Sequence, residues 1–69
     1  MRVNEILTRV EDTEVVCLHL GGTDIIDYKN GIMKTSRYKG NHVGDWLVTD
    51  ISVQELNKVL VLAITACRP

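Results

Sequence analysis

The chain has 69 residues, of which 45% are hydrophobic and 25% charged, and its formal net charge is −1. This length predicts one small domain over residues 1–69, which buries only about 60% of its unfolded surface and lacks room for a deep ligand pocket. The composition shows no basic excess for nucleic acid, and no apolar run approaches the roughly 18 residues of a membrane span.

The N-terminal residues contain no apolar segment typical of a secretory signal, and acids follow at Glu11, Asp12 and Glu14. We therefore expect a cytoplasmic protein without membrane contact. In that compartment Cys17 and Cys67 are expected to be reduced.

The first expected elements are a short helix and a strand. The chain begins with apolar residues at helical spacing, namely Val3, Ile6, Leu7 and Val10. A strand over residues 5–10 is the alternative. Residues 15–20 then form a short apolar run that Gly21 and Gly22 end, which favours a buried strand.

A hairpin is expected next, around Asn30-Gly31. Asn-Gly is the strongest local signal for a type I′ turn, whose two central residues need positive φ. It would join a strand over residues 24–28 to a strand over residues 32–38, and place Asp27 opposite Lys34.

The C-terminal part predicts a strand over residues 46–49 and then a helix over residues 53–66. Ser52 and Glu55 have the spacing of a capping box, and apolar residues follow at helical intervals. The alternative is a final strand over residues 58–65. The expected fold is α+β, a small antiparallel meander of about four strands packed by the C-terminal helix; the alternative is a small all-β barrel of SH3 or Sm-like type.

The residues with reactive side chains do not form a recognisable site. Cys17 and His19 share one side of a strand, but a nucleophile also needs a group that orients its base, and the sequence identifies none. Zinc ligands usually come in close pairs such as Cys-x-x-Cys, which these two residues, His42 and Cys67 do not form. Gly21-Gly22-Thr23 lacks the lysine and the following helix of a phosphate loop. We expect no catalytic residue, no metal and no cofactor.

The charge is unevenly distributed along the chain. Residues 28–46 hold four basic residues against one acid, whereas the remainder holds four basic residues against eight acids. Basic and aromatic side chains mix in this basic hairpin, as they do in protein-binding hot spots and in nucleic-acid sites. A solvated face is the third interpretation. The expected partner-binding residues are Lys34, Arg37, Tyr38, Lys39 and Trp46.

These features predict a small binding or regulatory protein that acts stoichiometrically through a protein partner and not as an enzyme. Inhibitors encoded by phages and mobile elements are often this size. The alternative is a small RNA- or DNA-binding module that uses the basic hairpin 28–46. Val61 and Leu62 would lie off the core side of the expected C-terminal helix, so they are the expected self-association residues of a homodimer.

Overall fold

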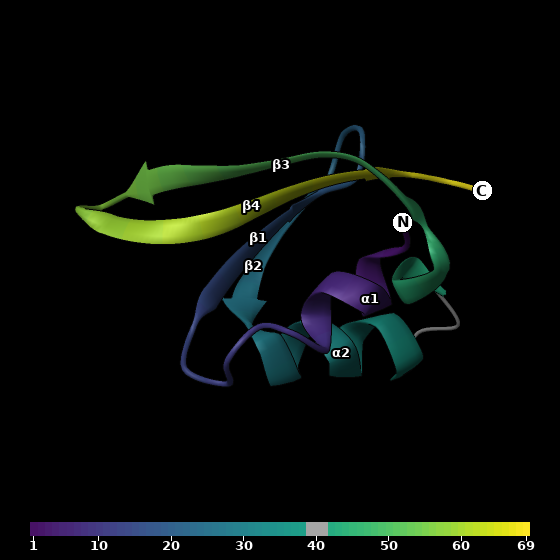
Figure 1. Cartoon of the computed structure of the whole chain (residues 1–69), viewed down its shortest axis with the longest axis horizontal. Coiled ribbons are helices and arrows are strands. Elements are labelled where there is room, and N and C mark those ends of the chain that lie inside the picture. Colours follow the sequence, from purple (N-terminus) through teal and green to yellow (C-terminus); the bar gives the residue numbers. More distant parts are fainter. Residues whose placement is uncertain (39–41) are drawn as a thin grey trace.

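The computed structural model describes residues 1–38 and 42–69, and only the backbone of residues 35–38. The elements follow in this order: α1 (Val3–Leu7), β1 (Val15–His19), β2 (Asp24–Tyr28), α2 (Lys29–Tyr38), the 3-10 helix η1 (Val43–Asp45), β3 (Leu47–Leu56) and β4 (Val59–Cys67). The fold is therefore α+β, as the sequence predicts (Figure 1). The predicted first helix and the strands over residues 15–20 and 24–28 are confirmed as α1, β1 and β2.

The four strands form one open, mixed sheet in the order β2-β1-β4-β3. β1 pairs antiparallel with β2 but parallel with β4, and β3 pairs antiparallel with β4. The predicted antiparallel meander is therefore wrong, because the chain crosses over to bring β4 beside β1. The barrel alternative is also wrong, since β2 and β3 are the two outer strands of an open sheet.

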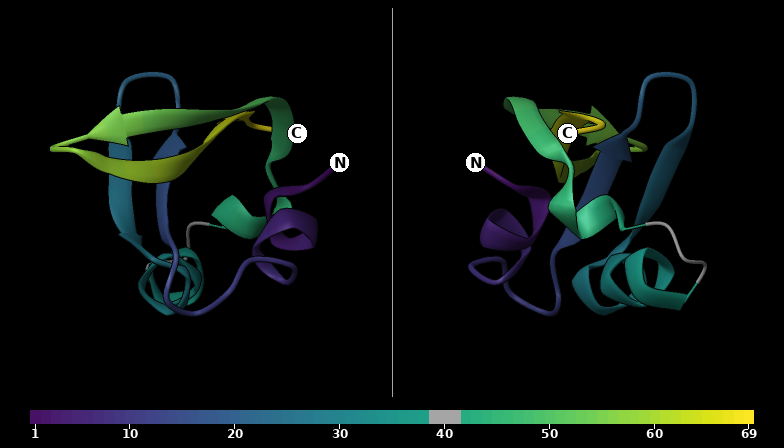
Figure 2. Two further views of the ribbon diagram at one scale, coloured as in Figure 1. Left: turned by 60° about the vertical axis from the view of Figure 1, so that its left-hand side comes forward. Right: turned by 90° about the vertical axis from the view of Figure 1, so that its right-hand side faces the viewer.

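The helices cover one face of this sheet, which we call the helix face (Figures 1 and 2). Val16 and Leu18 of β1 point to it, and the register places Leu62 and Ile64 of β4 beside them. These side chains pack against residues from the three helices. The buried residues of the resulting core are Val3, Leu7, Val10, Val16, Leu18, Ile32, Val43, Ile64 and Ala66. The opposite, open face carries Val15, Cys17, Val61 and Ala63.

The predicted hairpin at Asn30-Gly31 is wrong, because residues 29–38 form the helix α2. A type I′ turn needs positive φ, and in the described residues the only glycine with positive φ is Gly21. Glycine is needed at position 31 for a different reason, because a Cβ here would clash with the carboxylate of Asp27. The helix buries Ile32 in the core, and burial outweighs the local turn preference.

The predicted C-terminal helix is also wrong, and the alternative, a strand over residues 58–65, is confirmed by β4. β3 and β4 form a long hairpin whose turn residues, Asn57 and Lys58, have φ of 50° and 65°. Two positive φ values are what a type I′ turn requires. The apolar run 59–64 is typical of a strand with apolar neighbours on both faces, and its β-branched residues favour that state.

The end of this hairpin extends beyond the helices (Figure 1). Leu60 is 70% exposed and Val53 is 66% exposed, both on the helix face. Among the described residues, no helix has the length and apolar character needed to cross a bilayer.

Candidate functional site

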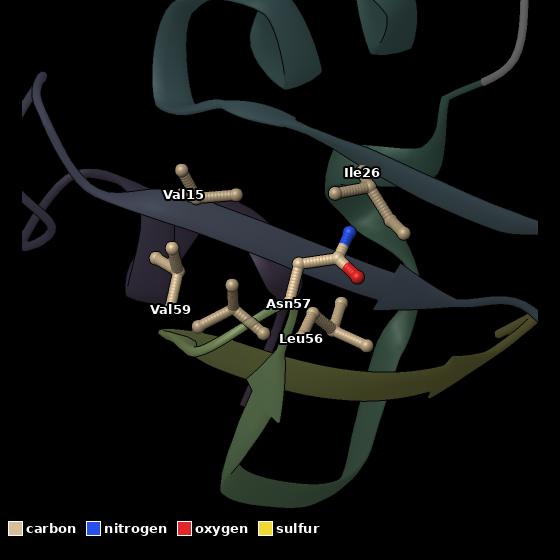
Figure 3. Close-up of a pocket in the computed structure, with 6 residues that line it drawn as sticks. Val15, Ile26, Leu56, Asn57 and Val59 are labelled. Atoms are coloured by element: carbon tan, nitrogen blue, oxygen red, sulfur yellow. The ribbon is translucent and has the colours of Figure 1, made fainter.

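An apolar groove of about 340 Å³ lies on the open face, between the first two strands and the end of the β3–β4 hairpin (Figure 3). Its floor is formed by Val15 of β1 and Val61 of β4, and Ile26 of β2 forms one wall. The hairpin supplies the opposite wall with residues on both sides of its turn: Leu56, Asn57 and Val59. Apart from the Asn57 amide, the lining side chains are apolar.

The strand register brings these residues together. Ile26 pairs with Cys17, two residues from Val15 on the same side of β1. Val61 precedes Ala63, which pairs with Cys17 from the other side. Val61 is buried at the bottom, whereas Ile26 is 56% exposed and Val59 is 53% exposed at the rim. The groove is thus a surface feature whose floor is buried at Val61 and half-buried at Val15.

A cluster of Cys17, His19 and Asp24 lies beside this groove on the same face. His19 Nε2 is 3.5 Å from the Cys17 sulfur, and His19 Nδ1 is 2.7 Å from Asp24 Oδ1. The turn between β1 and β2 positions them, because the Leu20 N–H donates to the Thr23 carbonyl at 2.9 Å and the register places His19 opposite Asp24. The expectation that Cys17 and His19 share one side of a strand is therefore confirmed, and Asp24 is the third group that sequence reasoning missed.

The electrostatics of this cluster favour a structural pair over a nucleophile. The hydrogen bond that His19 donates to Asp24 raises the pKa of His19 and outweighs the opposing effect of burial, while the negative charge of Asp24 and a hydrogen bond with Gln54 raise this pKa further. Burial raises the pKa of the Cys17 thiol, and the charge of Asp24 raises it further. Cys17 is only 2% exposed, so its sulfur is shielded from solvent, whereas a thiol nucleophile must be accessible. The described residues contain no group of three or more His, Cys, Asp or Glu placed to hold a metal ion.

Of the residues predicted to bind a partner, Lys34, Arg37 and Tyr38 lie on α2 and not on a hairpin. Lys34 is exposed on α2. The side chains of Arg37 and Tyr38, and the whole of Lys39, lie outside the described residues. Trp46 follows η1, packs partly against the core, and has the Arg68 guanidinium 5.6 Å above its ring. A partner-binding surface formed by these five residues therefore stays a prediction.

The residues predicted for self-association have a different setting from the one expected. Val61 is 3% exposed on the floor of the groove, and Leu62 packs partly against the core on the helix face. They point to opposite faces of β4 because they are neighbours in a strand. The geometric reason for the prediction, an uncovered side of a helix, therefore does not apply.

Two signals in the sequence bear on parts of this site. The β-branched residues in the apolar run 59–64 favour the alternative of a strand with apolar side chains on both faces. The paired strands 15–20 and 24–28, joined by a glycine turn, place His19 opposite Asp24 once their register is drawn. Comparison of the chain with protein-family models, with curated proteins and with solved structures finds no match.

Proposed function

We propose that this chain is a small binding protein that acts stoichiometrically, by holding an apolar side chain of a protein partner in the groove on its open face. The observation that supports this is the groove itself, in which Val61 is buried at the bottom and the apolar rim residues are half exposed. The chain acts by occupying the partner's surface and not by catalysis.

The rim residues give binding a driving force. Covering the exposed half of Ile26 or of Val59 contributes roughly 1 kcal/mol each, about half of the value for burying a whole side chain. Tyr28, next to Val15 across the β1–β2 pair, is also more than half exposed and adds an aromatic side chain to the rim. Tyrosine is enriched among residues that dominate protein–protein binding.

The shape of the groove favours a side chain of a protein over a free small molecule. Sites for small ligands cover most of the ligand surface, whereas this groove is open along the rim formed by Ile26 and Val59. A partner that inserts one apolar anchor would cover both rims with the surface around the anchor. The Asn57 amide at the hairpin turn can hydrogen-bond to the backbone of such a partner.

The test uses two neighbouring residues of β4 as a matched pair. Val59 lines the groove and Leu60 points to the opposite face, and both are apolar and exposed. A photo-crosslinking residue replaces Leu56 in the full chain, and crosslinking is carried out in the cells of origin with and without nuclease. The same experiment is repeated with Val59→Lys and with Leu60→Lys.

The proposal predicts that one protein is crosslinked at position 56 and that nuclease does not affect this adduct. The adduct should be lost with Val59→Lys and retained with Leu60→Lys. Equal crosslinking of both variants would refute it. Loss of the adduct on nuclease treatment would favour the nucleic-acid module. Lys34→Glu is included because loss of binding in that variant alone would place the contact on the predicted basic surface.

A further inference from the structure

The outer strand β3 presents a second surface, separate from the groove. β3 has ten residues, and one side of it pairs with β4. On its other side Arg2 forms a bridge with Leu47 and the Val48 N–H donates to the Met1 carbonyl, and no further pairing partner is found among the described residues. The other edge strand, β2, has five residues and carries Asp24 and Asp27, which discourage pairing with another chain. The free edge of β3 carries apolar Ile51 and Val53, which are 46% and 66% exposed on the helix face.

The hairpin turn determines which backbone groups of β3 point outward. A pair that closes a two-residue turn is hydrogen-bonded, so the Leu56–Val59 pair uses its backbone groups within the hairpin. The groups alternate along an antiparallel pair, and Val53 and Ile51 therefore direct their N–H and C=O groups to the free edge. An added antiparallel strand would form its hydrogen bonds with these two residues.

We propose that two copies of this chain pair through the free edges of their β3 strands, about a two-fold axis at Ser52. Antiparallel pairing by a two-fold axis keeps the helices of both copies on the same face, so each residue lies opposite one on its own face. In this register Ile51 of each copy lies opposite Val53 of the other. Asp50 lies opposite Gln54, whose amide can donate to the carboxylate.

Shifting the axis by one residue disrupts this complementarity. With the axis at Val53, the apolar Ile51 would face Glu55 and the charged Asp50 would face Leu56. With the axis at Ile51, Val53 would face the hydroxyl residue Thr49. The axis at Ser52 also avoids opposing like charges, which destabilise cross-strand pairs.

The same register joins the two cores. Within one chain, Ile64 pairs with Ile51 and Leu62 pairs with Val53. Pairing at Ser52 therefore creates a continuous apolar row across the interface on the helix face, from Ile64 and Ile51 of one copy to Val53 and Leu62 of the other. This row covers the two β3 side chains that a single copy leaves exposed.

A disulfide trap tests both the dimer and its register. In a Cys67→Ser background, which removes the exposed native cysteine, Ser52→Cys places two thiols at the axis, with Cβ atoms about 4.5–5.5 Å apart. Gln54→Cys is the matched control on the same face of β3. Its two copies are offset by four residues, or about 13 Å, which exceeds the roughly 7 Å that a disulfide can span.

The expected result is a dimer of the unmodified full chain by light scattering, with rapid crosslinking of Ser52→Cys and none of Gln54→Cys alone. Gln54→Cys mixed with Asp50→Cys should crosslink, because these positions face each other. Val53→Lys should weaken the dimer at least tenfold, since a lysine on an edge strand opposes pairing. A monomer at the highest concentration, or equal crosslinking at positions 52 and 54, would overturn the proposal.

Discussion

Replacing Gly31 with alanine tests why a glycine occupies the first turn of α2. A Cβ at this position would coincide with the carboxylate of Asp27. That carboxylate lies at the start of α2 and accepts a hydrogen bond from the Tyr28 N–H at 2.7 Å. The added methyl group must displace it, because a side chain moves more readily than the backbone of a packed helix.

Two opposing effects determine the magnitude. Alanine in place of glycine favours a helix by about 0.5–1 kcal/mol. Displacing Asp27 loses a hydrogen bond to a charged group, about 1.5 kcal/mol here, and a favourable charge at the helix N-terminus, about 0.5 kcal/mol. We therefore expect Gly31→Ala to lower the free energy of unfolding by about 1 kcal/mol.

The Asp27→Ala background isolates the cause. Without the carboxylate, Gly31→Ala should raise the free energy of unfolding by about 0.5–1 kcal/mol, so the effect changes sign between the two backgrounds. Urea titrations of the four proteins measure it, and for a chain of this size 1 kcal/mol also corresponds to a shift of about 4–8 °C in Tm. An equal effect of Gly31→Ala in both backgrounds would show that Asp27 is not the reason for the glycine.

Two further predictions concern the hairpin turn and the histidine pair. Lys58→Gly should raise the free energy of unfolding by about 0.5–1 kcal/mol, because glycine adopts the positive φ of this turn without steric cost; an unchanged urea midpoint would contradict a strained Lys58. Because Asp24 raises the pKa of His19, the stabilisation by this pair is complete below pH 6.5, the ordinary value, and is lost as the pH rises through the raised pKa of the folded state. The urea midpoint should therefore fall more between about pH 5 and about pH 8 in the wild type than in Asp24→Asn, and parallel profiles would refute the coupling.

The sequence predicts the elements whose pattern is local. Residues 15–20 form a strand because an apolar, β-branched run ends at two glycines, and the turn there uses Gly21 at a φ of +77°. Residues 3–7 form a helix because Val3 and Leu7, four positions apart, both reach the core. In these elements the side-chain pattern and the tertiary environment favour the same state.

The sequence misleads where a local signal competes with packing. Asn30-Gly31 has the composition of a tight turn, but the segment is helical and this helix buries Ile32 in the core. The actual two-residue turn is Asn57-Lys58, where lysine adopts positive φ and gives no signal in the sequence. The run 59–64 fits a helix and a strand equally well by hydrophobicity, and its parallel pairing with β1 depends on residues more than forty positions away.

The same nonlocal pairing determines which parts of the candidate site can be predicted from the sequence. The groove combines residues of β1 and β2 with the hairpin turn, and these segments meet only because β4 pairs beside β1. By contrast, Asp24 lies five residues from His19, across one short turn. The cluster of Cys17, His19 and Asp24 could therefore be predicted by drawing the β1–β2 register from the sequence, whereas the groove could not.

The two proposals together predict bivalent binding. Pairing of two β3 strands about an axis perpendicular to the sheet puts the helices of both copies on one side and both grooves on the other. A dimer would therefore engage two partner molecules held close together on a surface, with a gain in avidity over a single groove. Val53→Lys, on the helix face, should leave binding to a single partner molecule in solution unchanged but weaken binding to a densely immobilised partner. Biosensor measurements at high and low partner density decide this, and equal affinities of wild type and variant at both densities would show that the grooves act singly.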